Sequence, residues 1–273
     1  MKTELVPSRS PAAASRVAFR ALLLRDLVVL RKTLKEFVPR TVLQPFMLVF
    51  IFTYVFPKIG QSVGGAGAAG AFSTRLVAGV IGLAIMFQGL QSVALPMVQE
   101  FGYTREIEDR VLAPLPTALV AIQKVIWGAL SSLFSALLVF PIAAIVPVTP
   151  VHLHLNWPVV LTLIPLACYT SGALGLTFGT RFNPRTVPLL FGIVVIPLTF
   201  LGAIYYSWSS LEPIRWLQIA VLVNPLVYMT EGFRAALTTS PHMSLWAIYP
   251  VLLGFAALFT WLGINGFKKR VLS

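Results

Sequence analysis

Six long apolar stretches constrain the fold of this chain more than any other feature. A helix needs ~20 predominantly apolar residues to cross the hydrocarbon of a bilayer. Hydrophobic residues make up 57% of the 273 residues and charged residues only 11%, so a soluble domain could not cover them with polar surface. We therefore predict an all-α membrane protein with six transmembrane helices. The predicted spans are 41–57, 76–98, 125–147, 158–180, 187–206 and 243–267.

The charges are unevenly distributed along the chain. There are 21 Lys and Arg residues against 9 Asp and Glu, a net charge of +12. In a soluble protein this would suggest nucleic acid, but in a membrane protein the positive-inside rule is the simpler explanation. With both termini in the cytoplasm, 17 of the 21 basic residues lie inside. We expect a multi-pass protein of the cytoplasmic (inner) membrane, with no nucleic-acid partner.

The first predicted span follows a basic segment of about 40 residues, which is too long for the charged leader of a signal peptide. Residues 15–37 of this segment have apolar side chains at helical spacing, with cations away from them, which is typical of a helix in the membrane interface. Such a helix could be only an anchor in contact with membrane lipids, or a lever that transmits force from a cytoplasmic partner. Asp26 falls within the apolar stripe, where a carboxylate is costly unless it is paired, and slightly favours the lever. The candidate residues of this helix are Arg16, Arg20, Asp26 and Arg31.

The predicted loop 99–124 is unusually rich in charge for this chain. Glu106 and Arg110 are spaced as an i, i+4 pair on a short helix, which Pro114 and Pro116 then end. The helix could be a solvated loop, or it could dock in a groove on a soluble subunit, since it has apolar anchors with charges at the rim. The candidate coupling residues are Arg105, Glu106, Glu108, Asp109 and Arg110.

The segment 207–242 connects the last two predicted spans on the outside. Two helices are expected, at about 211–222 and 225–238. Ser209 or Ser210 could cap the first, and Asn224 with Pro225 begins the second. Each helix is only ~18 Å long, yet the segment is too apolar for a solvated loop, so we predict a re-entrant hairpin.

Two charged residues of this hairpin are spaced to pair with each other. Glu231 and Arg234 stand at i, i+3 on its second helix. An ionisable pair near the membrane is a functional candidate, and a purely structural role is equally open.

Three aromatic residues recur at i, i+4, i+8 in the first predicted span: Phe46, Phe50 and Tyr54. They share one face of a helix and could line a substrate path, although packing against a neighbouring helix is the simpler interpretation. His152 and His154 lie in an outer loop without a carboxylate or cysteine nearby, so we expect no metal site. The single cysteine, Cys168, excludes an intrachain disulfide.

Four segments carry a resemblance to a known family, in order along nearly the whole chain. They are RDLVVLR before the first span, VLQPFMLVFIFTYVF within it, TREIEDRVLAPLP followed by Lys124, and NPLVYMTEGFRAAL. Together they resemble the permease subunit of ATP-binding-cassette type-2 exporters, which include drug, nodulation-factor and polysaccharide exporters.

The resemblance implies one transmembrane permease domain, residues 1–273, paired with a second copy or a different permease. It also implies two separate ATPase subunits that bind ATP and Mg. The coupling helix and the N-terminal helix would relay their movement and so export an amphipathic or lipid-linked substrate, such as a drug, lipid or polysaccharide. The chain lacks the G-x-x-x-x-G-K-[ST] motif. We therefore expect a permease without catalytic residues or a bound cofactor of its own.

Two other classes of membrane protein remain as alternatives. An ion-coupled secondary transporter usually buries acidic groups or histidines at mid-membrane, whereas all nine acidic residues here fall outside the predicted spans. A membrane-embedded enzyme would need a carboxylate pair, a Ser/His/Asp set or a metal cluster in the spans, and we find none in the sequence.

Overall fold

The computed structural model describes residues 10–61, 69–102, 115–148, 151 and 153–271, and this part of the chain is helical without strands. The long helices are α1 (Pro11–Phe50), α3 (Ala69–Gly102), α5 (Thr117–Ile145), α6 (Trp157–Arg181) and α11 (Leu245–Val271). The short ones are α2 (Phe56–Lys58), α7 (Val187–Leu190), α8 (Ile196–Phe200), α9 (Arg215–Ala220) and α10 (Pro225–Leu237). Two π-helical segments, Ile51–Val55 and Phe191–Val195, continue α1 and α7, and 3₁₀ turns lie at Trp208–Leu211 and Val221–Val223.

Five helices in the described residues are long and apolar enough to cross a membrane. They match the predicted spans except the fifth, at 187–206. There the apolar helical stretch covers only Val187–Phe200, about 21 Å at 1.5 Å per residue, and it is interrupted by the π-helical segment. All-α architecture is therefore confirmed, while the sixth span stays a prediction.

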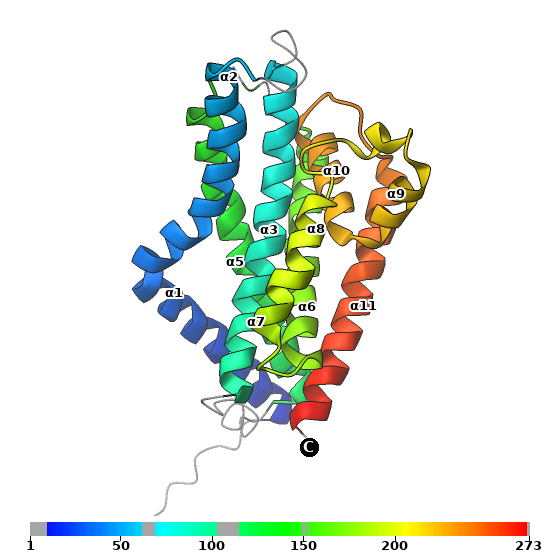
Figure 1. The fold of residues 1–273 in the computed structure, drawn as a ribbon. Helices are drawn as coiled ribbons and strands as arrows, with labels where there is room; N and C mark the ends of the chain where they lie inside the picture. The colour runs from blue at the N-terminus through cyan, green and yellow to red at the C-terminus, as the bar shows by residue number, and fades with distance from the viewer. Residues whose placement is uncertain (1–9, 62–68, 103–114, 149–150, 152, 272–273) are drawn as a thin grey trace, which may run out of the picture.

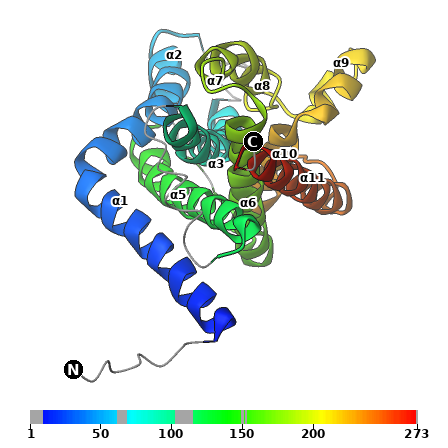
Figure 2. The same cartoon turned by 90° about the horizontal axis from the view of Figure 1, so that it is seen from below.

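The N-terminal helix is longer than predicted. The interfacial helix expected at 15–37 and the span expected at 41–57 form one bent helix, because α1 continues from Pro11 to Phe50. Pro39 and Pro45 lie inside it and remove two backbone donors, which accounts for a change of direction rather than a break. Its first part runs obliquely outside the bundle across α5 before the helix turns along the other helices (Figures 1 and 2).

The centre of the bundle is formed by α3, α5 and α6 (Figure 2). Glycines let these helices approach closely: a Cβ built on Gly172 of α6 would lie 2.5 Å from the carbonyl oxygen of Val125 in α5. A Cβ on Gly175 would lie 2.8 Å from the carbonyl oxygen of Gly89 in α3. Small residues at helix contacts are typical of packing within a membrane, where backbones must come close to gain van der Waals contact.

The two ends of the bundle differ in chemistry. What we call the basic end, at the bottom of Figure 1, carries Arg181, Lys268, Lys269 and Arg270 where α6 and α11 finish. What we call the hairpin end, at the top, holds α9 and α10. The flanks of the predicted loop 99–124 lie at the basic end. They are part of α3 and α5, which leave only 103–116 between them.

Candidate functional site

Several predicted site residues lie outside the described residues. Residues 103–114 include all five coupling candidates, namely Arg105, Glu106, Glu108, Asp109 and Arg110, so their roles stay predictions. His152 is also outside, and His154 is exposed. Among the described residues there is no group of three or more His, Cys, Asp or Glu side chains that could hold a metal ion.

The second arm of the predicted hairpin forms as expected. Asn224 caps α10: its side-chain oxygen accepts from the backbone N–H of Leu226 at 2.9 Å, and Pro225 occupies the first helical position. The Asn224 amide also donates to the carbonyl oxygen of Leu198 at 2.8 Å, which ties the start of α10 to α8. Every residue of α10 is buried, so this helix belongs to the protein core.

The first arm differs from the prediction. Instead of a helix over 211–222, the chain makes a 3₁₀ turn, the six-residue α9 and a second 3₁₀ turn. Ser209 and Ser210 do not cap a helix there; both hydroxyls hydrogen-bond with Ser207 instead. The helix α9 begins only at Arg215, two residues after Pro213. The described hairpin therefore consists of one buried helix and one short, irregular arm, and its re-entry into a membrane remains a prediction.

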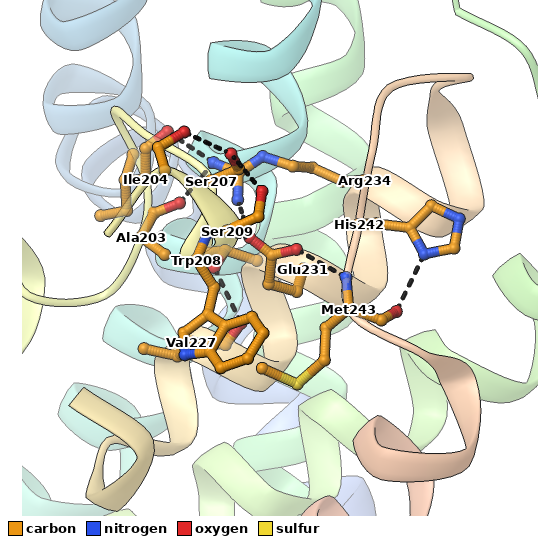
Figure 3. A network of polar contacts seen from close by, with 12 residues as sticks. Ala203, Ile204, Ser207, Trp208, Ser209, Val227, Glu231, Arg234, His242 and Met243 are labelled. Carbon is orange, nitrogen blue, oxygen red and sulfur yellow. Dashed lines mark hydrogen bonds and ion pairs between the residues drawn. The ribbon is translucent and has the colours of Figure 1, made fainter. Parts of the chain in front are cut away.

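Glu231 and Arg234 form a buried ion pair on α10, with Arg234 Nη1 at 2.6 Å from Glu231 Oε1 and each side chain 1% exposed. The Glu231 carboxylate also accepts from two backbone N–H groups, that of Trp208 at 2.8 Å and that of Met243 at 2.9 Å. One side chain thereby holds the chain on both sides of α10, as the close-up in Figure 3 shows.

Arg234 reaches a third segment. Its Nη2 donates to the carbonyl oxygens of Ala203 and of Ile204, the latter at 3.1 Å. Ala203 has a φ of 54°, a left-handed conformation that costs a residue with a Cβ of order 1 kcal/mol or more. The guanidinium binds the carbonyls that this turn directs toward α10, so it compensates for an unfavourable backbone.

Burial sets the electrostatics of this pair. It lowers the pKa of the Arg234 guanidinium, and the Glu231 carboxylate raises that pKa again. The guanidinium keeps its proton in either case. Since each charge is desolvated and bound by the other and by backbone groups, the network is suited to fixing the connection between α8 and α11. Of the two roles left open by the sequence, this geometry favours the structural one.

At the basic end, polar side chains join α1, α3 and α5. Asp26 is buried in the apolar stripe of α1 as predicted, and its Oδ2 accepts from Gln123 Nε2 of α5 at 2.7 Å. The next residue, Lys124, pairs with Glu100 of α3 at 2.5 Å, and both side chains are buried. We call these four side chains the joint at the basic end: Asp26, Gln123, Glu100 and Lys124. Glu100 is in the last turn of α3 and Lys124 is in the first turns of α5, the two helices that flank residues 103–116.

The other predicted residues of α1 are arranged as their spacing indicated. Arg16, Arg20 and Arg31 are exposed. The aromatic rings at the end of α1 and in the π-helical segment that continues it stack in series, Phe46 on Phe50 with centroids 5.6 Å apart and Phe50 on Tyr54 at 5.2 Å. Tyr54 is 41% exposed, so this ladder is not buried within one copy of the chain.

Comparison with known proteins identifies the family. The family model described as ABC-2 type transporter matches residues 17–238, from the first turns of α1 to the end of α10. The chain belongs to the ABC-2 type transporter family. It is similar to the inner membrane transport permease YadH of Escherichia coli (strain K12), 27% identical over 223 residues that cover 81% of this chain and 84% of that protein. The protein of the same name from Shigella flexneri shows the same values.

Family membership makes this ABC-2 chain a permease-type membrane subunit of an ABC transporter with several transmembrane helices. The family normally works with ABC ATPase partners. The resemblance seen in the sequence is thus confirmed.

Several polar residues of this ABC-2 permease were not predicted from the sequence. Glu100 was expected beyond the end of a span at 98, but α3 continues to Gly102 and buries it. Gln88 and Gln91, also in α3, carry no charge and so did not stand out as ionisable groups within a span do. Their spacing could have identified them, because two amide side chains at i, i+3 within an apolar stretch lie on one face of a helix.

The contact between Asp26 and Gln123 can be tested by substitution. Gln123→Leu removes the donor and leaves the buried carboxylate without this bond, at a cost of ~1–3 kcal/mol. We expect α1 to detach more readily from α5, which increases tryptic cleavage in the arginine-rich part of α1. The control is Asp26→Asn, which retains an acceptor oxygen and should change cleavage little. Equal cleavage of wild type and Gln123→Leu would contradict a role for this bond in holding α1.

Proposed function

We propose that this ABC-2 permease is the membrane half of an exporter in the cytoplasmic (inner) membrane, with the basic end and both termini in the cytoplasm. Two permeases pair in the membrane, and two ATPase subunits that bind ATP and Mg dock beneath them. Their movement drives an amphipathic or lipid-linked substrate outward. The positive-inside rule supports the orientation, since the basic residues gather at one end of the bundle.

The observation that carries this proposal is the joint at the basic end. A force applied to the loop between α3 and α5 acts through the ends of these helices on Glu100, in the last turn of α3, and on Lys124, in the first turns of α5, which are paired and buried. Gln123 is next to Lys124 in α5 and donates a hydrogen bond to Asp26 on the oblique part of α1, so a displacement of α5 also acts on α1. Buried polar pairs transmit displacement because separating them is costly. The joint therefore suits a relay from an ATPase to α1, which forms one wall of the bundle.

The docking role is tested by charge reversal in the predicted coupling loop. Glu106→Lys combined with Asp109→Lys should remove attraction to the ATPase and reduce the ATPase retained on the purified permease by about tenfold or more. Transport coupled to ATP hydrolysis should fall with it, while membrane insertion stays normal. The control is Glu212→Lys, a reversal of an exposed residue at the hairpin end.

The outcomes separate the functional classes. Retention of an ATPase by wild type and its loss in the double variant agree with the proposal. Unchanged retention and transport in the double variant would contradict the docking role. Uphill transport by the permease alone in vesicles, without any ATPase, would contradict the whole proposal and favour an ion-coupled secondary transporter.

A further inference from the structure

A crevice of about 740 Å³, lined by both polar and apolar side chains, opens between the bend of α1 and the bundle. Its walls come from α1, α3 and α5, with Pro188 of α7 at one edge. The volume lies in the range of sites for small molecules, ~300–1,000 Å³. Polar side chains in a membrane bundle are expensive and are retained chiefly for function. Thr41, Gln88, Gln91 and Ser131 lie on its polar side, while residues such as Leu95 and Val98 make the rest of its lining apolar.

Hydrogen bonds already present decide what the crevice can offer a ligand. Thr41 donates to the amide oxygen of Gln88 at 3.1 Å, and Arg40 donates to that of Gln91 at 3.3 Å. These bonds use the amide oxygens, so the amide NH₂ groups remain as the donors of these two glutamines. Ser131 adds a hydroxyl that is 1% exposed and makes no hydrogen bond within the described residues. A buried hydroxyl without a partner is costly, and a bound polar group would satisfy it.

The charges of the crevice cancel. Among the described residues that line it, Glu36 and Arg40 are the charged ones, at i, i+4 on α1, and they have opposite signs. The remaining polar groups are amides and hydroxyls, which both donate and accept, and Trp127 adds an aromatic ring. This combination suits a head group that carries many hydroxyls and no net charge, as a sugar does.

An apolar groove of about 350 Å³ adjoins the crevice. Leu30 and Phe37 of α1 line both, so the two sites lie on either side of these side chains. The groove continues over Leu34, Leu137 and Leu138 between α1 and α5. Leu34 and Leu137 are 44% and 57% exposed, so an alkyl chain can reach the groove from outside.

We infer that the bend of α1 holds a binding site for an amphipathic molecule with a neutral, hydroxyl-rich head group. The head group occupies the polar side of the crevice, where Gln88 and Gln91 donate to its oxygens and Ser131 gains a partner. The alkyl tail lies in the apolar groove. This inference deepens the proposed function, on which it rests, because it names the class of molecule that the exporter would accept.

The test is protection of a reporter thiol in the assembled complex with its ATPase, in lipid nanodiscs. The reporter is Ser92→Cys on a Cys168→Ala background, modified by a methanethiosulfonate reagent. We expect dodecyl maltoside to slow modification by about tenfold and dodecylphosphocholine, with the same tail and a zwitterionic head group, to slow it less than about twofold. Adding Gln88→Leu and Gln91→Leu should abolish protection by the maltoside, whereas the same change at the exposed residue Gln61, Gln61→Leu, should leave it intact.

Three results would overturn the inference. Equal protection by both detergents would show that the tail alone binds. Protection that survives Gln88→Leu with Gln91→Leu would place the head group elsewhere. A reporter that is unreactive before any probe is added would show that protein, such as a second permease, fills the crevice. Retention of the ATPase, measured on the same samples, reports separately on the proposed function.

Discussion

Arg234→Met is expected to destabilise the protein strongly, by ~3–5 kcal/mol. The substitution keeps much of the volume of the side chain but leaves the Glu231 carboxylate, 1% exposed, without its counter-charge. It also removes the donor to the carbonyls of Ala203 and Ile204. Thermal unfolding followed by size-exclusion chromatography in detergent measures the effect. We expect protein level and transport to fall together, because the network holds the connection between α8 and α11.

The chain supplies a matched control for this prediction. Glu212 and Arg215 have the same i, i+3 spacing, but their side chains are 73% and 76% exposed and their charges are 3.8 Å apart. Arg215→Met should change stability by less than ~0.5 kcal/mol. The double variant Glu231→Gln with Arg234→Met should be more stable than Arg234→Met alone, since it leaves no buried unpaired charge. Normal stability with lost export in Arg234→Met would instead make the pair functional.

Gly172→Ala is expected to separate α6 from α5, with a loss of ~1–3 kcal/mol or more. The added methyl group would lie 2.5 Å from the carbonyl oxygen of Val125 and 3.2 Å from the backbone nitrogen of Ala129. Both neighbours are backbone atoms of a packed helix, so neither can move without moving α5. The same thermal measurement in detergent, with the amount of folded protein in the membrane, reports the effect.

Gly254→Ala in α11 is the control for packing. A Cβ at this position meets nothing within 4 Å. Because alanine has a higher helix propensity than glycine, we expect no loss of stability and a gain of up to ~1 kcal/mol. If Gly172→Ala were as stable as Gly254→Ala, the close approach of α5 and α6 would not limit the fold.

The limits of helices could be predicted where one local rule dominated. The predicted span 158–180 corresponds to α6 at Trp157–Arg181 because a single apolar run lies between polar residues. The start of α10 was predicted from Asn224 and Pro225, whose capping preference is local. The fifth span was less predictable. Apolar character extends to residue 206, but the backbone leaves the helix after Phe200 to form the turn at Ala203.

Some candidate residues could be found from the sequence but their partners could not. Asp26 stood out because a carboxylate in an apolar stripe is costly. Its partner, Gln123, is 97 residues away and has no distinguishing local pattern. The crevice residues Gln88 and Ser131 acquire meaning only because the bend of α1 leaves space beside them.

The sequence by itself determined that this chain is a helical membrane protein of the ABC-2 type transporter family, because apolar length and the order of motifs are properties of the linear chain. It also determined that Glu231 and Arg234 can pair, since three residues along a helix bring them to one face. Only the tertiary structure decided which backbone groups this pair holds, how α1 joins α5, and where a crevice opens. Those features depend on how the helices pack, and packing brings together residues that lie far apart in the chain.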